Sequence, residues 1–191
     1  PTLLPPPSTL HPPPTLHPPS SSSASGRMEF TVSKATHTWP KIARLVTGLA
    51  ERQLPGFRFT TLQLNRDCGA KLHVDRNNHG PSRIIGLGDY DGGGLWVMDP
   101  AGSEPVVVEE PLPGYRHLVG QTLLGKVHDI KNTWCEFDGN LPHKTLPSRG
   151  TRISLVFFTR KRWLEMEAVP KRTLEDFGFP LPAAGYPGTA P

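Results

Sequence analysis

The stretch Lys71-Leu72-His73-Val74-Asp75 decides how this sequence is interpreted, because a histidine and an aspartate stand two residues apart in an extended segment. Successive side chains of a strand alternate between its faces, so His73 and Asp75 point to the same side. A second histidine, His143, lies far downstream, just before an apolar stretch at residues 151–159. Two imidazoles and one carboxylate on one face of an iron leave the opposite positions open, as non-haem Fe(II) oxygenases require. The pattern predicts a mononuclear metal site of this kind.

An arginine and a serine follow on the strand that we expect after His143. Arg152 comes nine residues after His143, and Ser154 lies two residues further, on the same strand face. A planar guanidinium matches a carboxylate, and a serine hydroxyl can donate a hydrogen bond to the same group. The pattern therefore includes a site for 2-oxoglutarate. Without Arg152 and Ser154, the three metal ligands would suit zinc as well as iron.

The rest of the sequence favours many short strands. Glycine and proline turns separate stretches of alternating or continuous apolar residues. We expect strands at residues 57–64, 83–87, 94–98, 105–108, 115–119, 123–127, 133–137 and 151–159. This pattern predicts a mainly β protein with flanking helices, folded as a double-stranded β-helix, also called a jelly roll or cupin-like fold.

One amphipathic helix is expected before the strands, from Pro40 to about Gln53. Thr38 or Thr36 would cap it, and Pro40 suits its first turn. Apolar residues recur at helical spacing and predict the face that packs on the sheet: Ile42, Leu45, Val46 and Leu49.

The composition indicates one folded domain with two flanking segments. The chain has 191 residues, of which 36% are hydrophobic, enough for one ordinary core. Residues 1–27 are rich in proline and serine, so we expect a disordered arm that serves as a linker or binds a Pro-recognising module. We expect the dioxygenase domain at residues 28–165 and a partly disordered C-terminal extension at residues 166–191.

Charge and composition also limit the kinds of partner that this chain can have. The net charge of +4 permits an anionic partner such as nucleic acid, and basic residues cluster at Arg160-Lys161-Arg162 and Lys171-Arg172. No stretch is long and apolar enough to cross a bilayer, so we expect a soluble intracellular protein. Two cysteines do not make a disulfide framework, and Cys68 is close enough to His73 in sequence to line the site.

Several motifs together resemble the Fe(II)/2-oxoglutarate dioxygenase superfamily, and most of all its TET/JBP-type branch with protist and algal relatives. They are Asn65-Arg66-Asp67-Cys68-Gly69-Ala70-Lys71-Leu72-His73-Val74-Asp75-Arg76-Asn77-Asn78, Gly80-Pro81-Ser82, Gly92-Gly93-Gly94-Leu95-Trp96-Val97 and Phe137-Asp138-Gly139-Asn140-Leu141-Pro142-His143. The resemblance implies a jelly roll with iron held by His73, Asp75 and His143. It also implies that Arg152, with Ser154 beside it, binds the far carboxylate of 2-oxoglutarate, and that O2 is consumed with ascorbate as a reductant.

The resemblance further implies a nucleic-acid substrate. Asn77 or Asn78 would line the base pocket, and Asn65 would contact the co-substrate or the base. The expected reaction is hydroxylation of the methyl group of 5-methylcytosine or of a related modified pyrimidine. The chain departs from the animal members, because two cysteines cannot build their Cys-rich zinc region. Two alternatives stay open: a hydroxylase of a protein side chain or small molecule, and a non-catalytic binding module on the same fold.

Overall fold

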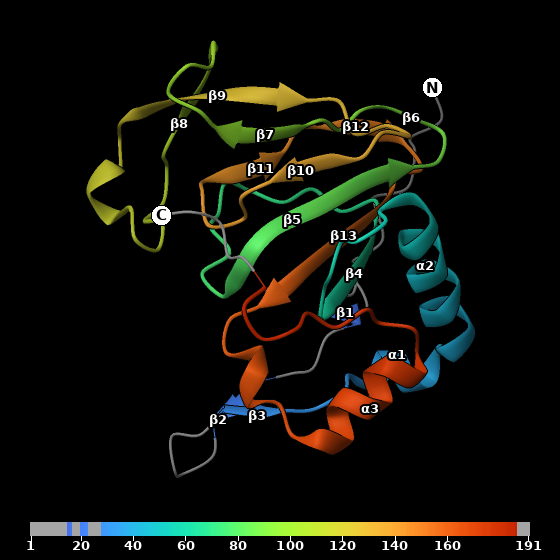
Figure 1. Ribbon diagram of the computed structural model, residues 1–191. Helices are drawn as coiled ribbons and strands as arrows, with labels where there is room; N and C mark the ends of the chain where they lie inside the picture. The colour runs from blue at the N-terminus through green and yellow to red at the C-terminus, as the bar shows by residue number, and fades with distance from the viewer. Residues whose placement is uncertain (1–14, 17–19, 23–27, 187–191) are drawn as a thin grey trace.

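Two antiparallel sheets face each other in the structure, a computed structural model that describes residues 15–16, 20–22 and 28–186 (Figure 1). The larger sheet has five strands, in the order β1 (Thr15–Leu16), β4 (Thr61–Arg66), β13 (Ile153–Arg160), β5 (Asn78–Leu87) and β10 (Cys135–Phe137). The smaller sheet has four, in the order β11 (His143–Thr145), β7 (Leu95–Met98), β9 (Thr122–His128) and β8 (Glu104–Val107). Two short ladders pair β6 (Tyr90–Gly92) with β12 (Ser148–Gly150) and β2 (Ser20–Ser22) with β3 (Met28–Phe30).

The order of the strands makes the fold a jelly roll. Neighbouring strands are mostly not consecutive in sequence, because the chain passes repeatedly from one sheet to the other. In the larger sheet, for example, β13 lies between β4 and β5 and pairs antiparallel with both. The predicted double-stranded β-helix is therefore confirmed.

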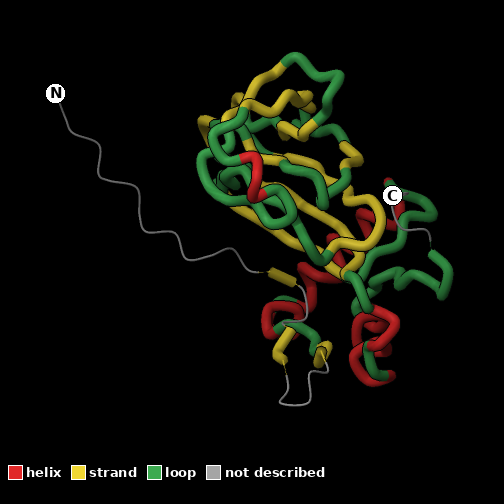
Figure 2. Tube along the Cα trace, turned by 90° about the vertical axis from the view of Figure 1, so that its left-hand side faces the viewer, coloured by secondary structure: helices red, strands yellow, loops and turns green. Residues whose placement is uncertain are grey.

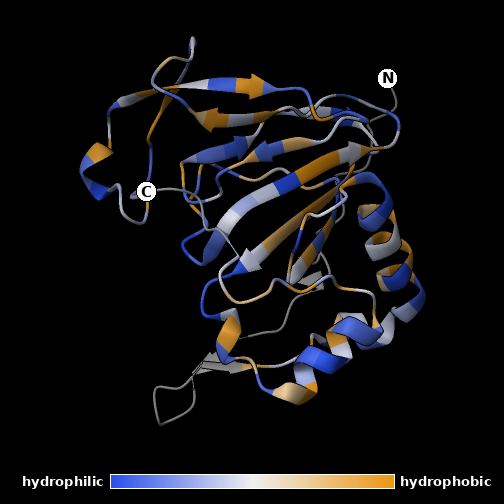
Figure 3. Cartoon of the chain, viewed as in Figure 1, coloured by the Kyte–Doolittle hydropathy of each residue, from blue (hydrophilic) through white to orange (hydrophobic). Residues whose placement is uncertain are grey.

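The strand β13 separates two apolar regions, because its side chains alternate between the faces of the larger sheet. Leu155 and Phe157 point outward toward the helices, whereas Ser154 and Val156 point into the space between the sheets. Orange hydrophobic segments run along β13 and part of β5 (Figure 3). The apolar residues between the sheets come from both of them and from the connecting loops: Ile84, Leu95, Val97, Ile130, Cys135 and Phe137.

The helices cover the outer face of the larger sheet. They are α1 (Lys34–Thr38), α2 (Pro40–Gln53) and α3 (Ala168–Asp176), and both views place them away from the smaller sheet (Figures 1 and 2). Phe59 and Phe157 meet edge to face in this core, with ring centroids 4.9 Å apart. Leu62 and Leu174 are buried beside them. Burial of these side chains on one face leaves the other face of the sheet free to build a site.

The helix α2 has the predicted bounds and a different buried face. Ile42 and Leu45, which we expected to be buried, are 40% and 67% exposed. The helix instead buries Val46 together with three small residues: Ala43, Thr47 and Ala50. Small side chains let a helix lie close to a sheet, and packing density then decides which stripe is buried. The Thr47 hydroxyl also donates to the Phe177 carbonyl at 2.9 Å, which ties α2 to the end of α3.

The predicted helix cap was wrong. Ser33 caps the short helix α1, and Trp39 stands at the start of α2 without a side-chain cap. Pro40 takes the first helical position, where its missing N–H costs nothing.

Most predicted strands are present, with shifted ends. The strand expected at residues 115–119 was wrong, because this stretch forms the 3-10 helix η1 (Arg116–Leu118). A second 3-10 helix, η2 (Trp163–Glu165), follows β13. The strands β6, β11 and β12 were not expected. Each has only three residues, too few for a periodic pattern to show in sequence.

Residues 166–179 contribute side chains to the core. Met166, Leu174 and Phe179 are buried in the same apolar cluster as α2 and β13. Residues 1–27, with their predicted role as a linker or ligand, lie largely outside the described residues. Among the residues that are described, no helix combines the length and the apolar character needed to cross a membrane.

Candidate metal centre

Two segments far apart in sequence are joined at the predicted metal ligands. His73 and His143 form an isolated antiparallel bridge, in which each backbone N–H donates to the carbonyl of the other residue at 3.0 Å. The Asp75 N–H donates to the Gly139 carbonyl at 2.7 Å. His143, which lies before the strand expected at residues 151–159, is itself the first residue of β11. Strand pairing on both sides therefore holds its backbone.

The ligand atoms of His73, Asp75 and His143 all lie within 4.8 Å of one another. The His73 Nε2 atom is 3.6 Å from Asp75 Oδ1, and the His143 Nε2 atom is 3.8 Å from Asp75 Oδ2. The carboxylate thus lies between the two imidazoles, with one oxygen toward each. This is the donor set of two histidines and one carboxylate that the sequence predicted.

Each of the two imidazoles is oriented by a hydrogen bond to the backbone carbonyl two residues before it. The His73 Nδ1 atom is 2.7 Å from the Lys71 carbonyl, and the His143 Nδ1 atom is 2.8 Å from the Leu141 carbonyl. A carbonyl can only accept, so each Nδ1 carries the proton and donates. The lone pair of a neutral ring then lies on Nε2, which points at Asp75. Such hydrogen bonds to the outer nitrogen fix the tautomer and direction of a metal-binding histidine.

Burial favours the metal-binding form of His143. The pKa of its imidazole is lowered, first because burial disfavours the charged ring and second because His73 is close. The Asp75 carboxylate opposes part of this shift. A ring that stays neutral keeps its Nε2 lone pair for a metal.

Asn78 and Gly139 position the carboxylate of Asp75. The Asn78 amide donates to Asp75 Oδ2 at 3.1 Å and to the Ser82 hydroxyl at 3.2 Å. A Cβ atom at Gly139 would lie 2.7 Å from Asn78 Nδ2 and 3.0 Å from Asp75 Oδ2. Only glycine leaves room for this hydrogen bond.

A cavity of about 300 Å³ opens from the three ligands into the space between the sheets. One wall is apolar and includes Ile84, Leu95 and Phe137. Polar side chains line part of the remainder: Gln63 donates to Asn65 Oδ1 at 3.0 Å, and Asn65 donates to the Ser154 hydroxyl at 3.2 Å. Cys68 also lines the cavity, as predicted. The metal ligands therefore border a partly apolar chamber with donors on one side.

Arg152 is buried behind Cys68, and it forms no ion pair with a carboxylate among the described residues. Its side chain is only 2% exposed, and Nη1 donates to the Cys68 carbonyl at 3.3 Å. The Nε atom has no hydrogen-bond partner among the described residues. The Arg152 backbone is held by Asp67, whose Oδ1 accepts from the Arg152 N–H at 2.7 Å. A buried guanidinium without a counter-ion is costly unless a ligand supplies one.

Tyr90 presents a second buried polar group beside this guanidinium. Its hydroxyl has no hydrogen-bond partner in the part of the chain that the structure describes. The Arg152 Cζ atom lies 5.8 Å from the Tyr90 ring centroid. Burial raises the pKa of the Tyr90 hydroxyl, and the Arg152 charge opposes part of that rise. The tyrosine is therefore kept protonated, as a hydrogen-bond donor to an anion must be.

The unpaired groups lie at the Ser154 end of the cavity. Ser154 pairs with Gly86 across β13 and β5. A Cβ atom at Gly86 would clash with the Tyr90 hydroxyl, so the hydroxyl lies over this glycine. Arg152 precedes Ser154 by two residues, although its side chain does not itself line the cavity. The orphaned Arg152 Nε and Tyr90 hydroxyl, with Ser154 beside them, fit a carboxylate at this end.

Sequence reasoning missed Tyr90 and Gly139. Tyr90 stood in a glycine-rich turn, Asp89 to Gly93, and nothing local marked it. Its place follows from the pairing of β6 with β12, which sets Tyr90 opposite Gly150, two residues before Arg152. Such a pairing between short strands has no signal in the sequence.

The two asparagines predicted to bind substrate both line a second pocket next to Asp75, and they differ in burial. Asn78 is buried, and its amide binds Asp75 and Ser82, so it orients a metal ligand. Asn77 is exposed and lines a second pocket next to Asp75. The roles of Asn77 and Asn78 in substrate binding stay predictions. Asn65 lies in the wall of the metal cavity, against Ser154.

The solved structures to which this chain is similar include the following two. One is an oxidoreductase of the 2OG-Fe(II) oxygenase family from Burkholderia pseudomallei, with 20% identity, a TM-score of 0.43 and 75% of this chain covered. This chain spans 65% of that protein. The other is a prolyl-4-hydroxylase from Pseudomonas putida, with 19% identity, a TM-score of 0.29 and coverage of 68% and 69%. No protein-family model and no curated protein matches the sequence.

Proposed function

We propose that this chain is an Fe(II)- and 2-oxoglutarate-dependent dioxygenase that hydroxylates a C–H bond. One observation carries the proposal. The ligand atoms of His73, Asp75 and His143 lie within 4.8 Å of one another at a cavity that Ser154 also lines, and the unpaired polar atoms of Arg152 and Tyr90 are buried behind the Ser154 side of that cavity. A metal site alone has many uses, and a buried anion site beside it restricts them.

The donor set suits iron together with a chelating co-substrate. Three protein ligands on one side leave positions free for 2-oxoglutarate and O2. Zinc sites with three protein ligands also exist, but they do not require a buried guanidinium at the end of the cavity. When bound, Fe(II) and 2-oxoglutarate supply the oxidation of a C–H bond by O2, with release of succinate and CO2. Ascorbate would serve as an external reductant.

The residues of the chain would hold and orient the reactants. Arg152, Tyr90 and Ser154 would bind the far carboxylate of 2-oxoglutarate by charge-assisted hydrogen bonds, which are strong where water is excluded. The apolar wall keeps water from this end of the cavity. Asn65 would present its amide along the co-substrate, since it already donates to Ser154. The protein thus supplies position and electrostatics, and the metal supplies the redox chemistry.

For the substrate, we propose a methyl group of 5-methylcytosine or of a related modified pyrimidine in nucleic acid. The TET/JBP-like motifs and the basic residues after β13 support this choice. Asn77, next to metal ligand Asp75 in its pocket, would face the base. The target base must leave its stack to reach a buried metal. Hydroxylation of a protein side chain or small molecule is the alternative on the same metal centre.

An anaerobic titration with Fe(II) and 2-oxoglutarate tests the metal and co-substrate sites. We expect the visible metal-to-ligand absorption band in the wild-type chain and its loss in His143→Ala. A folded chain without this band would instead be a non-catalytic binding module. Mass spectrometry of methylated DNA and RNA after incubation with iron, 2-oxoglutarate and ascorbate then tests the substrate. Succinate formation stimulated by peptides or metabolites, and not by methylated oligonucleotides, would reject the nucleic-acid substrate.

A further inference from the structure

A second pocket of about 450 Å³ adjoins the metal site. It shares Asp75 and Gln63 with the metal cavity, so it opens beside the metal ligands. Val74 and Phe158 form the apolar part of its lining. The polar residues of the lining offer mainly hydrogen-bond donors. The lining comprises Gln63, Val74, Asp75, Arg76, Asn77, Asn78, Phe158 and Arg160.

Two arginines give this pocket a positive charge. Arg160 is 8% exposed, and Arg76 lies at the exposed rim. The single carboxylate in the lining is Asp75, which is committed to the metal centre. With Asp75 bound to a cation, the pocket attracts anions. Burial lowers the pKa of Arg160, because its charge is poorly solvated there.

The position of Arg160 separates it from the co-substrate site. Arg152 directly precedes β13, and Arg160 is the last residue of that strand, eight residues further along the chain. At about 3.3 Å per residue their backbones are roughly 26 Å apart. The inward-facing residues Ser154, Val156 and Phe158 lie between them. An anion at Arg160 is therefore not the carboxylate that Arg152 would hold.

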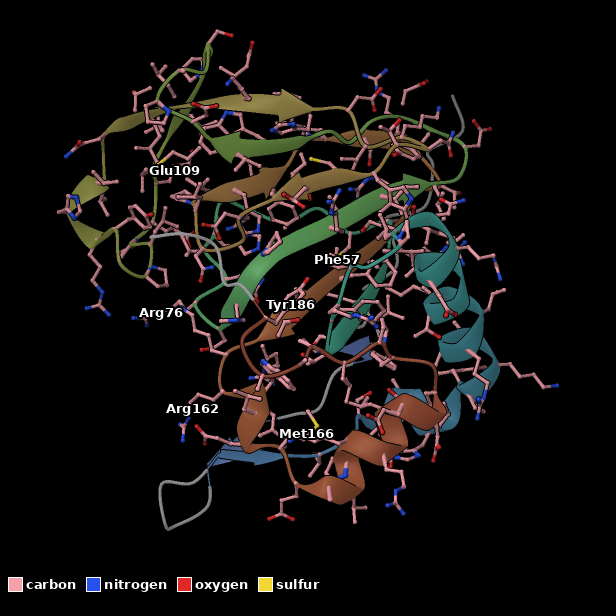
Figure 4. The ribbon with its side chains drawn as sticks, in the orientation of Figure 1. Phe57, Arg76, Glu109, Arg162, Met166 and Tyr186 are labelled. Atoms are coloured by element: carbon pink, nitrogen blue, oxygen red, sulfur yellow. The ribbon has the colours of Figure 1, made fainter. Side chains whose placement is uncertain are left out.

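Lys161 holds the turn that carries Arg76 next to the end of β13, where Arg160 lies. Its backbone N–H donates to the Asn77 carbonyl at 2.7 Å, and its Nζ donates to the Arg76 carbonyl at 3.1 Å. These bonds tie the turn at residues 76–77 to the end of β13. Figure 4 shows Arg76 in the loop before β5 and Arg162 at the start of η2. The two pocket arginines thus come from segments that are joined to each other.

We propose that this pocket binds a phosphate group of the substrate strand, adjacent to the group that is oxidised at the metal. The inference rests on the proposed function and names a contact within it. Guanidinium groups match phosphate oxygens two at a time, and two of them can share one phosphate. Phe158 and Val74 form an apolar surface against which a sugar or a flanking base can pack.

The test measures binding of a short single-stranded DNA with a central 5-methylcytosine to the full chain. Fluorescence anisotropy is read without oxygen, with Fe(II) and 2-oxoglutarate bound, so that no turnover occurs. We expect Arg160→Gln and Arg76→Gln each to weaken binding about tenfold or more, as for a lost hydrogen bond to a charged group. Arg162→Gln is the matched control, because Arg162 is exposed, pairs with Glu165 and lies outside the pocket.

Removing the charge of single phosphates in the DNA identifies which phosphate the pocket binds. Single phosphates of the DNA are replaced in turn by uncharged methylphosphonates. One replacement should weaken binding to the wild-type chain at least as much as Arg160→Gln does, and should have a smaller effect on the Arg160→Gln chain, in which only Arg76 remains to bind the phosphate. Wild-type binding that tolerates every replacement, or an Arg160→Gln chain as sensitive as wild type, would overturn the inference. Equal competition by an acidic peptide of the same charge would overturn phosphate in favour of carboxylate.

Folding and the proposed function are checked separately. Arg160 is buried, so thermal melting must show that its variant folds, and Arg76→Gln at the exposed rim gives the same answer without that risk. If the wild-type chain lacks the visible Fe(II) and 2-oxoglutarate band, the proposed function fails. If the band is present and the methylphosphonates have no effect, the phosphate site alone fails.

Discussion

Replacing Tyr90 by phenylalanine should stabilise the protein in the absence of 2-oxoglutarate and weaken its binding of 2-oxoglutarate. A buried tyrosine hydroxyl usually makes a hydrogen bond, and its removal then destabilises the fold. The Tyr90 hydroxyl is buried without a partner among the described residues, so there is no bond to lose. The variant removes a polar group whose burial opposes folding, and it keeps the ring that packs against Arg152.

The structure sets the size of both effects. An unpaired buried hydroxyl costs about 1–3 kcal/mol. Tyr90→Phe should thus raise the free energy of unfolding by about 1 kcal/mol or more, or the Tm by about 2–4 °C for a chain of this length. The same hydroxyl would donate to the carboxylate of 2-oxoglutarate, a bond worth about 1.5–3 kcal/mol. The Kd for 2-oxoglutarate should therefore rise about tenfold to a hundredfold.

Two measurements check the signs. Thermal or urea unfolding of the metal-free chain gives the stability, and an anaerobic titration of the Fe(II)-loaded chain with 2-oxoglutarate gives the Kd. Tyr115→Phe is the matched control, because Tyr115 is half-buried and lies outside both pockets beside the metal ligands. A destabilised Tyr90→Phe chain would mean that the hydroxyl has a partner in the free protein. An unchanged Kd would refute its place in the co-substrate site.

Three further predictions concern other parts of the molecule. Arg152→Lys should raise the Kd for 2-oxoglutarate about tenfold or more although the charge is kept, because the fork is lost; equal 2-oxoglutarate titrations of the two chains would contradict this role. Gly139→Ala should lower the affinity for Mn(II) about tenfold to a hundredfold in calorimetry, because its Cβ atom would displace Asp75. Gly69→Ala is the control and should leave this affinity unchanged, because its Cβ atom would meet open space. Phe157→Ala should lower the free energy of unfolding by about 3–5 kcal/mol in urea titrations, since its ring is fully buried against Phe59; a loss below about 1 kcal/mol would argue against this packing.

Long periodic segments and spaced polar residues could be predicted from the sequence. Strands β7, β8, β9 and β13 follow clear apolar stretches, and helix α2 begins at Pro40 as expected. The convergence of His73, Asp75 and His143 was also expected. An H-x-D pair on an extended segment shares one face by geometry alone, and a jelly roll brings a distant strand end beside it.

Features that depend on contacts between distant short segments could not be predicted. The predicted buried face of α2 was wrong. The small residues Ala43 and Ala50 pack closely against the sheet, whereas Leu45 is exposed to solvent. The strand predicted at residues 115–119 was wrong for a similar reason. Its apolar residues suit a strand, but no sheet edge pairs with them in the described structure, and the chain closes a 3-10 turn instead.

The sequence by itself determined the types of ligand and their spacing: two histidines, an aspartate, and an arginine nine residues after the second histidine. The residue types and their spacing can be read along the chain, and the local geometry of a strand decides which of them share a face. The tertiary structure alone decided that Tyr90 leaves a hydroxyl unpaired beside Arg152, that Asn78 holds Asp75, and that Arg160 lies in a pocket beside the metal ligands. Each of these depends on pairing between strands that are distant in the chain. Such pairing is chosen by the packing of the whole fold, and no local pattern of residues encodes it.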